Sequence, residues 1–262
     1  MPEGDTIYRT AAQLRRVLEG RTVSAARGRW EVEDAATLAE RRCDSIETRG
    51  KHLLMHFDDQ RVLHSHMGMT GSWHIYRRGE PWRKSQKAAA IVLDLEDFVV
   101  VCFSPKLLEL VSSVQLKGNN YLRRLGPDLL GSSLDRDEIV ARFRTQDRVS
   151  IGQAVMNQTV VCGIGNVYKS EVLFLETIHP LTPVRDLTDH QIWSLVERSE
   201  QLMRRNLEGY PRRTRFLPGE KLWVYDRSGD PCLKCGTRVE MIRQGDLGRS
   251  TYFCPECQTR TA

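Results

Sequence analysis

The chain has 262 residues, of which 40% are hydrophobic and 28% charged, and its formal net charge is +5. This composition excludes a largely disordered chain, and the sequence lacks both the long apolar run of a membrane helix and the N-terminal pattern of a signal peptide. We therefore expect a cytosolic protein long enough for two domains, in which closely spaced cysteines favour metal binding over disulfides.

The first residues, "MPEGDT", place a proline and a glutamate directly behind the initiator methionine. Removal of Met1 would leave a free amine on Pro2, and an α-amino group is more often uncharged at neutral pH than a lysine. Attack of that amine on an aldehyde-like carbon gives an iminium that permits elimination, with Glu3 placed to move a proton. If Met1 is retained, the nitrogen is an amide and this nucleophile does not exist. These residues alone leave the role open.

A helix is predicted over residues 5–20, with Asp5 as its N-cap and Gly20 as its stop. Pro2 and Glu3 would then precede the positive end of the helix dipole. The apolar positions that share one helical face are Ile7, Ala11, Leu14 and Leu18.

Short β-rich runs separated by turn residues fill residues 22–103, which predicts a mainly antiparallel sheet or sandwich. A linker around residues 112–130 follows, so the first domain is expected over residues 1–115. The runs are "HLLMHF", "RVLHSH", "SWHIY", "AAAIVLDL" and "FVVVCF".

The pattern then turns helical, which predicts an α+β protein whose second domain spans residues 125–220. The run "RRNLEGYPRRTR", residues 204–215, holds five arginines and fits either a solvated loop or a contact with a polyanion. The expected helices are "DRDEIVARFR", "IGQAVMNQTVV", "NVYKSEVLFLET" and "LTDHQIWSLVERSEQLMRRNL".

Four cysteines in the spacing C-x2-C-x18-C-x2-C predict a tetrahedral zinc site in a third segment, residues 221–262. The ligands would be Cys232, Cys235, Cys254 and Cys257. Four thiolates close the coordination sphere, so one structural zinc per chain is expected to staple a β-hairpin built from "WVYDRSGDPCLKCG" and "GRSTYFCPECQ". Cys43, Cys102 and Cys162 are expected to be small buried residues.

Arg249 would project from a glycine turn between the two cysteine pairs. By itself it fits either a solvated hairpin charge or a phosphate ligand.

Four motifs together give the chain a recognisable form: "MPEG", "TRGKHLLMHF", "GIGNVYKSEVLF" and "GRSTYFCPECQ". In this order, over essentially the whole chain, they resemble the formamidopyrimidine-DNA glycosylase and endonuclease VIII family of base-excision repair. The resemblance implies that Pro2 is the Schiff-base nucleophile, that Glu3 is the paired acid, and that Lys51 assists catalysis and contacts phosphate. It also implies that Asn166 and Arg249 hold DNA phosphates.

Repair enzymes of this kind expel the target base and fill the gap that it leaves. "HMGMTGSW" corresponds to the family's inserting loop, in which Met69 is the candidate wedge, with Thr70 the weaker one. From sequence alone Met69 fits the core almost as well.

Some residues depart from the family's pattern. Thr6 replaces a carboxylate near the lesion pocket, which leaves the substrate range open, and Asn157 stands where an aspartate is common. "SPKLLEL" lacks the arginine and phenylalanine of formamidopyrimidine-type members, which favours the endonuclease VIII side.

The expected function is a monomeric glycosylase and abasic-site lyase acting on damaged DNA, duplex or single-stranded, with oxidised pyrimidines favoured and β,δ-elimination. It would be associated with the nucleoid if the source is bacterial. Two alternatives remain at this point: a non-catalytic damage-binding protein, and a formamidopyrimidine or 8-oxoguanine-type glycosylase.

Overall fold

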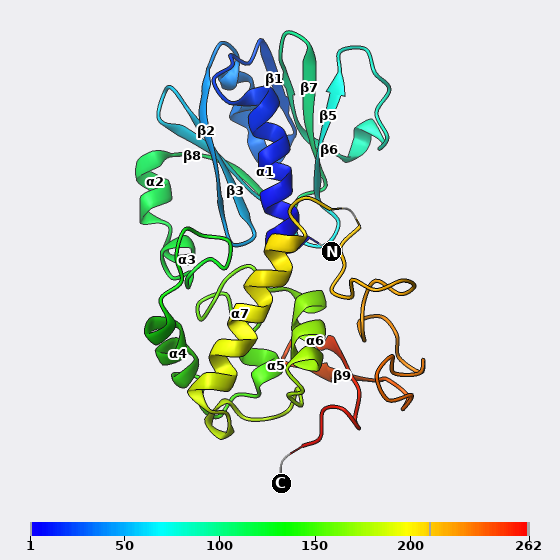
Figure 1. Cartoon of the computed structure of the whole chain (residues 1–262). Coiled ribbons are helices and arrows are strands. Elements are labelled where there is room, and N and C mark those ends of the chain that lie inside the picture. The colour runs from blue at the N-terminus through cyan, green and yellow to red at the C-terminus, as the bar shows by residue number, and fades with distance from the viewer. Residues whose placement is uncertain (1, 210, 261–262) are drawn as a thin grey trace. The chain divides into compact units, whose positions relative to one another are not determined.

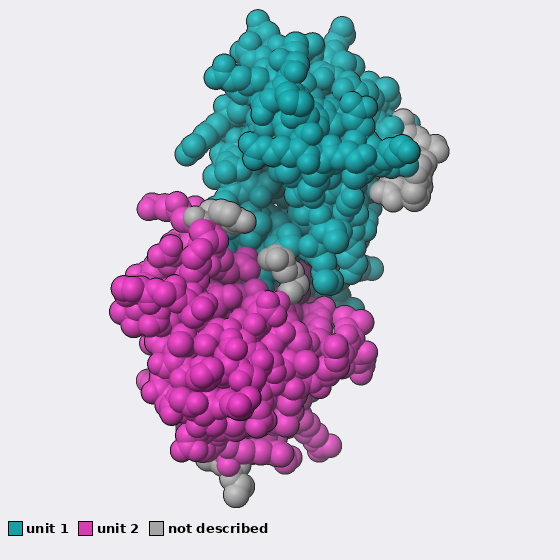
Figure 2. Space-filling view, turned by 90° about the vertical axis from the view of Figure 1, so that its right-hand side faces the viewer, with its two compact units in different colours: residues 1–124 teal, residues 125–262 magenta. Residues whose placement is uncertain are grey.

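The computed structural model describes residues 2–209 and 211–260, without the side chains of residues 30–33. The chain divides into two compact units, residues 1–124 and 125–262 (Figure 2). Within the described part of the chain, no helix is both long and apolar enough to cross a membrane. Met1, on whose removal the proposed nucleophile depends, lies outside the described residues.

The first unit is a β-sandwich of two four-stranded antiparallel sheets behind a leading helix (Figure 1). Helix α1 (Gly4–Leu18) comes first. One sheet has the order β1 (Ala25–Gly28), β6 (Ala89–Asp94), β7 (Phe98–Phe103), β5 (Ser72–Arg77). The other has the order β2 (Cys43–Arg49), β3 (His52–Phe57), β4 (Arg61–His66), β8 (Leu107–Ser112).

The core of this unit joins the helix to both sheets. The apolar face of α1, which the helical spacing predicted, is buried in one cluster with Ile46, Leu63 and Val100. Strand β7, buried over all but its first residue, is a continuous apolar run because both of its faces are covered.

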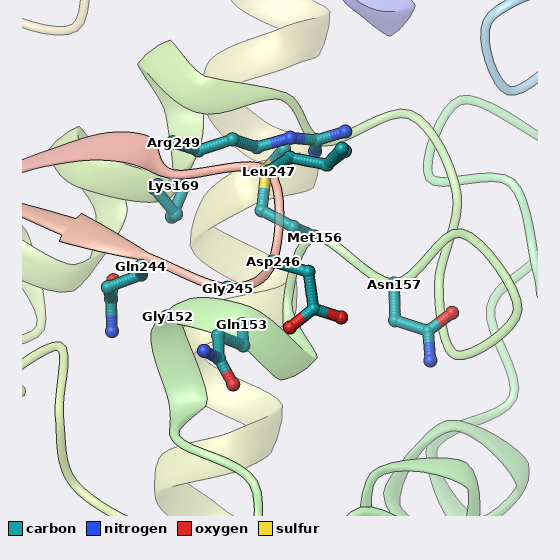
Figure 3. Close-up of a pocket in the computed structure, with 10 residues that line it drawn as sticks. All are labelled: Gly152, Gln153, Met156, Asn157, Lys169, Gln244, Gly245, Asp246, Leu247 and Arg249. Atoms are coloured by element: carbon teal, nitrogen blue, oxygen red, sulfur yellow. The ribbon is translucent and has the colours of Figure 1, made fainter.

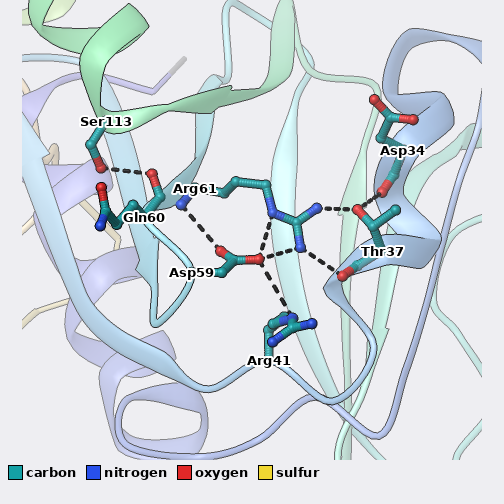
Figure 4. A network of polar contacts seen from close by, with 7 residues as sticks. All are labelled: Asp34, Thr37, Arg41, Asp59, Gln60, Arg61 and Ser113. Atoms are coloured by element: carbon teal, nitrogen blue, oxygen red, sulfur yellow. Dashed lines mark hydrogen bonds and ion pairs between the residues drawn. The ribbon is translucent and has the colours of Figure 1, made fainter.

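The 3₁₀ helix η1 (Trp30–Leu38) is tied to the β3–β4 turn by a polar network (Figure 4). Arg61 donates through its backbone N–H and through Nε to the two carboxylate oxygens of Asp59, at 3.1 and 2.7 Å. Its Nη2 donates to the carbonyl oxygen of Thr37 at 2.7 Å, and Arg41 lies 3.5 Å from Asp59. The network fixes the beginning of β4.

The short helices α2 (Ser113–Gly118) and α3 (Asn120–Arg123) lead to the second unit. The helical part of that unit contains α4 (Arg136–Arg144), α5 (Ile151–Ala154), α6 (Asn166–Leu175) and α7 (Asp189–Arg205). Also present are η2 (Gln86–Ala88) in the first unit and η3 (Val184–Asp186) in the second. A hairpin of β9 (Glu240–Gln244) and β10 (Arg249–Phe253) packs against α6.

The expected fold class, a β-sandwich with a helical part and a four-cysteine hairpin, is confirmed. Four local expectations differ from the structure. Asp5 is not the N-cap, because the N–H groups of Thr6 and Ile7 already donate to the carbonyl oxygen of Glu3 and the helix begins at Gly4.

The helix expected over residues 151–161 ends at Ala154. Asn157 breaks it, because its side chain accepts hydrogen bonds from the backbone N–H and hydroxyl of Thr159 and so closes a turn. The segment expected to be extended at residues 223–236 consists of turns, and the strand that pairs with β10 lies between the cysteine pairs. The region expected to be strands also contains η1.

Candidate functional site

Helix α1 holds the two N-terminal candidates at its positive end. Glu3 occupies the N-cap position, and the N–H groups of Thr6 and Ile7 donate to its carbonyl oxygen at 2.9 and 3.1 Å. Its carboxylate makes no capping hydrogen bond and is fully buried, whereas Pro2 is half-buried. A carboxylate shielded from water beside a proline nitrogen is suited to moving a proton to or from a reacting group.

Lys51 lies in the two-residue turn between β2 and β3 and is half-buried. Gly50 precedes it at φ 59°, a conformation that favours glycine and makes this turn tight. Helix α1 packs against both strands, and Arg15 Nε donates to the carbonyl oxygen of Ile46 at 2.8 Å. Lys51 is therefore carried by the hairpin on which the helix bearing Pro2 and Glu3 rests.

Three histidines next to Lys51 form a cluster that the sequence reasoning missed. His52 pairs with His66 across β3 and β4, and His64 lies two residues before His66 on the same face of β4. The ring centroid of His52 is 5.0 Å from that of His64 and 4.7 Å from that of His66. The signal in the sequence is the spacing of two in "HSH" on a predicted strand.

His52 and His66 are uncharged at neutral pH, because burial depresses the pKa of each. Burial lowers the pKa of His52 to about 3, helped by the neighbouring histidines and by Lys51 and Arg49. Burial also lowers the pKa of His66 to about 4, and the positive charges of Lys106 and Lys51 act in the same direction. Neutral imidazoles can each donate and accept a hydrogen bond.

Met69 is 77% exposed in the turn between β4 and β5, so its placement in the core is wrong. The turn is tight because Gly71 N–H donates to the carbonyl oxygen of Met67 at 3.0 Å, and a Cβ on Gly71 would lie 2.4 Å from that oxygen. Gly68, at φ 62°, has no room for a Cβ either, because that atom would lie 2.7 Å from the Cβ of Lys106. A constrained loop that exposes one large apolar side chain is suited to insertion into an apolar stack.

In the second unit, α6 begins at Asn166, which is 5% exposed. Its Nδ2 donates to the hydroxyl of Ser250 on β10 at 3.0 Å, while its buried Oδ1 has no hydrogen-bond partner among the described residues. Lys169, one turn later, donates to the Ser250 carbonyl oxygen at 3.0 Å. These bonds join the first turn of the helix to the strand that starts at Arg249.

Arg249 is exposed, directly after the turn that Gly245 and Gly248 form at positive φ. It lines a pocket of about 410 Å³ together with Gln153, Asn157, Lys169 and Asp246 (Figure 3). The arrangement places a guanidinium, an ammonium, amide groups and the carboxylate of Asp246 around one hollow, and the two positive groups can bind a phosphate group.

The "GIGN" loop before α6 is held from within. The side chain of Gln158 donates to the carbonyl oxygens of Met156 and Ile164 at 2.9 and 3.1 Å, and accepts from the N–H of Gly163 at 3.2 Å. Gly163, at φ 111°, adopts a conformation that other residues rarely reach. These bonds hold the loop in one conformation, which fixes the position of the N-terminus of α6.

The four cysteines of the hairpin segment come together, with their sulfur atoms all within 4.8 Å of one another. Cys232 Sγ lies 3.8 Å from Cys257 Sγ, and Cys235 Sγ lies 3.5 Å from Cys254 Sγ. Tetrahedral zinc with Zn–S bonds of about 2.3 Å needs sulfur–sulfur distances of about 3.8 Å. The donor set therefore fits a zinc ion. Phe174, Val224 and Val239 pack with Cys232 and Cys254 in one apolar cluster.

The remaining cysteines, Cys43, Cys102 and Cys162, are buried as expected. Burial raises the pKa of the Cys43 thiol to about 12 and raises that of Cys102 as well. Both thiols are therefore protonated at neutral pH and weakly nucleophilic.

Three family models match the chain. They are the formamidopyrimidine-DNA glycosylase N-terminal domain over residues 1–106, the H2TH domain of the same enzymes over residues 125–215, and a zinc finger found in FPG and IleRS over residues 229–260.

Relatives of similar length match from end to end. The "Probable endonuclease 8 2" of Streptomyces coelicolor is 34% identical over 265 residues, covering 100% of this chain and 95% of that protein. The "DNA-(apurinic or apyrimidinic site) lyase Nei2" of Mycolicibacterium smegmatis is 34% identical, covering 99% of both chains. A formamidopyrimidine-DNA glycosylase of Bacillus licheniformis is 32% identical, with 99% of both chains covered.

Among solved structures, formamidopyrimidine-DNA glycosylase of Lactococcus lactis, bound non-covalently to DNA with an abasic site, has a TM-score of 0.83 at 23% identity. The match covers 99% of this chain and 100% of that chain. At this identity the similarity shows that the fold is shared.

Proposed function

This chain belongs to the family of formamidopyrimidine-DNA glycosylases and endonuclease 8 enzymes, and from this premise we propose a function in base-excision repair. It is a bifunctional DNA glycosylase and abasic-site lyase that removes oxidised bases, with pyrimidines favoured, and cleaves the strand by β,δ-elimination. The observation that carries the proposal is Pro2 beside a fully buried carboxylate, Glu3, at the N-terminus of α1.

In this mechanism the Pro2 amine attacks the sugar carbon that bears the damaged base. The new carbon–nitrogen bond replaces the glycosidic bond, the base leaves, and opening of the sugar ring gives an iminium. Because the iminium withdraws electrons, the neighbouring C–H becomes acidic and the strand phosphates can be eliminated in turn. Glu3 transfers protons in these steps, and Lys51 assists them and contacts phosphate.

DNA is the proposed partner, damaged and either duplex or single-stranded. Asn166 and Arg249 bind its phosphates, supported by the pocket that Arg249 and Lys169 line and by the hydrogen bonds that tie Asn166 to β10. Met69 is the proposed wedge, supported by its exposure on a constrained turn. Phosphate contacts release counterions from DNA, so the affinity for DNA should fall steeply as the salt concentration rises.

We assign the roles along the chain as catalysis to residues 1–115, DNA binding to residues 125–220, and a zinc-stabilised hairpin to residues 221–262. One structural zinc per chain, held by the four cysteines, would fix the position of Arg249. The enzyme would act as a monomer in the cytosol, at the nucleoid if its source is bacterial.

Strand incision tests the proposal. Protein without Met1 is incubated with two oligonucleotides, one that contains thymine glycol and one that contains 8-oxoguanine opposite cytosine. The ends of the products are then identified. We expect cleavage at the oxidised pyrimidine with phosphate on both ends of the gap, and none with Pro2→Gly.

The same assay separates the alternatives. Faster excision of 8-oxoguanine would identify a formamidopyrimidine-type enzyme. DNA binding without any incision would identify a non-catalytic damage-binding protein.

A further inference from the structure

A continuous hydrogen-bonded chain crosses three neighbouring strands of the first unit, from Glu109 through His64 to His52. His64 Nδ1 lies 2.8 Å from Glu109 Oε1, and His64 Nε2 lies 2.8 Å from His52 Nδ1. His64 and His52 are 1% and 4% exposed, whereas the Glu109 side chain is 34% exposed. The chain thus begins at the surface and ends in the buried cluster beside Lys51.

The chemistry of the three groups gives one consistent arrangement of the protons. A carboxylate accepts hydrogen bonds, so in this arrangement His64 donates to Glu109 from Nδ1. His64 Nε2 is then an acceptor, and His52 must donate to it from Nδ1. His52 Nε2, at the inner end, is left with a lone pair that can accept a proton.

The charges around the inner end are positive. Lys51 and Arg49 act on His52 from the β2–β3 side, and the neutral ring of His66 lies beside it on β4. The ring of Tyr121 on α3 lies 5.4 Å from that of His52, and Lys106, before β8, acts on His66. Glu109 is the carboxylate at the outer end of the chain.

We propose that Glu109, His64 and His52 form a proton relay between the surroundings of Lys51 and solvent. A proton taken up at His52 Nε2 displaces the Nδ1 proton to His64 Nε2, and His64 passes its own Nδ1 proton to Glu109, which releases it to water. No electrons are transferred, and one proton leaves the interior; the reverse sequence supplies one.

This inference rests on the proposed function, because each elimination step of a lyase removes a proton from carbon. In the proposal His52 and His64 exchange that proton with the site by way of Lys51, the neighbour of His52 in the sequence, and are relay and positioning residues. The three groups within hydrogen-bond distance, His52, His64 and Glu109, carry it to solvent.

Two variants interrupt the relay without removing its hydrogen bonds. In His64→Gln the amide can bond to both neighbours but cannot pass a proton through itself. In Glu109→Gln the amide oxygen still accepts from His64, but the charge is lost. His74→Gln is the matched control, because His74 is also held by two side chains, Ser72 and Tyr76, on the other sheet.

The single-turnover rate of cleavage at an abasic site is measured from about pH 5.5 to about pH 9. DNA affinity and thermal unfolding are measured for the same variants. We expect both relay variants to cleave about tenfold or more slowly, with an altered pH profile and unchanged affinity, because general acid–base steps contribute at least this much. His74→Gln should behave as the wild type.

Wild-type rates across this pH range in both variants would overturn the relay. A loss of rate that merely follows a loss of DNA affinity or of stability would also overturn it, because Glu109, His64 and His52 would then have only a structural role. Failure of the proposed lyase is distinguishable, because wild-type protein would then cleave no DNA, and the relay would fall with it.

Discussion

At the scale of single residues, Glu171 organises a loop far from it in the sequence. Its carboxylate is fully buried on α6 and accepts the backbone N–H groups of Trp223, Val224 and Tyr225 at 2.7–2.8 Å. The hydroxyl of Thr214 donates to the same group. One side chain thus fixes the segments on both sides of residues 215–222, including the end of the arginine-rich run.

Replacing Glu171 with glutamine should destabilise the protein by about 2–4 kcal/mol, because an amide NH₂ group would face donors that need an acceptor. Chemical denaturation measures the change. Glu197→Gln, on the exposed face of α7, is the matched control and should change stability by less than about 0.5 kcal/mol. Equal effects of the two substitutions would show that the carboxylate is not the anchor.

The residue scale also shows what the sequence could and could not predict. The apolar face of α1 and the four cysteines were predictable because each follows a fixed spacing. The relay was not, because His52, His64 and Glu109 meet only through the register of β3, β4 and β8, which no local pattern specifies. Asn157 ended α5 because its side chain competes with the helix for backbone donors.

At the scale of elements, three strands, β3, β4 and β7, have the bounds of the runs that predicted them. Strands β1 and β2 gave weaker signals, because their exposed positions interrupt any apolar run. Arg227 donates to the carbonyl oxygens of Trp223 and Pro231, and these bonds hold the segment before the first cysteine pair in turns. Side-chain bonds of this kind leave no periodic pattern in the sequence.

Removing the metal tests the hairpin as an element. We expect chelation, or Cys235→Ser, to release about one zinc per chain and to lower affinity for abasic-site DNA by about tenfold, the effect of losing one charged hydrogen bond. Arg249→Ala in zinc-loaded protein should reproduce this loss, and Arg238→Ala, exposed on the same segment, should not. Full affinity after complete loss of zinc would contradict the proposed role of the hairpin.

At the scale of the whole molecule, the candidate residues are divided between the two units. Pro2, Glu3, Lys51 and the relay belong to the first, while Asn166, Arg249 and the four cysteines belong to the second. Each group has its own anchoring: the sandwich core for the first, and the bonds between α6 and the hairpin for the second. In our account the first unit performs the chemistry and the second contributes phosphate binding.

The proposed function requires the Pro2 nitrogen to form a covalent bond with the sugar. Borohydride trapping on an oligonucleotide with one abasic site detects this bond, with the adduct located by mass spectrometry. We predict an adduct on Pro2 that is absent from Pro2→Gly and from protein that retains Met1. Correctly processed protein that binds the oligonucleotide but yields no adduct, or an adduct on a lysine, would contradict the account.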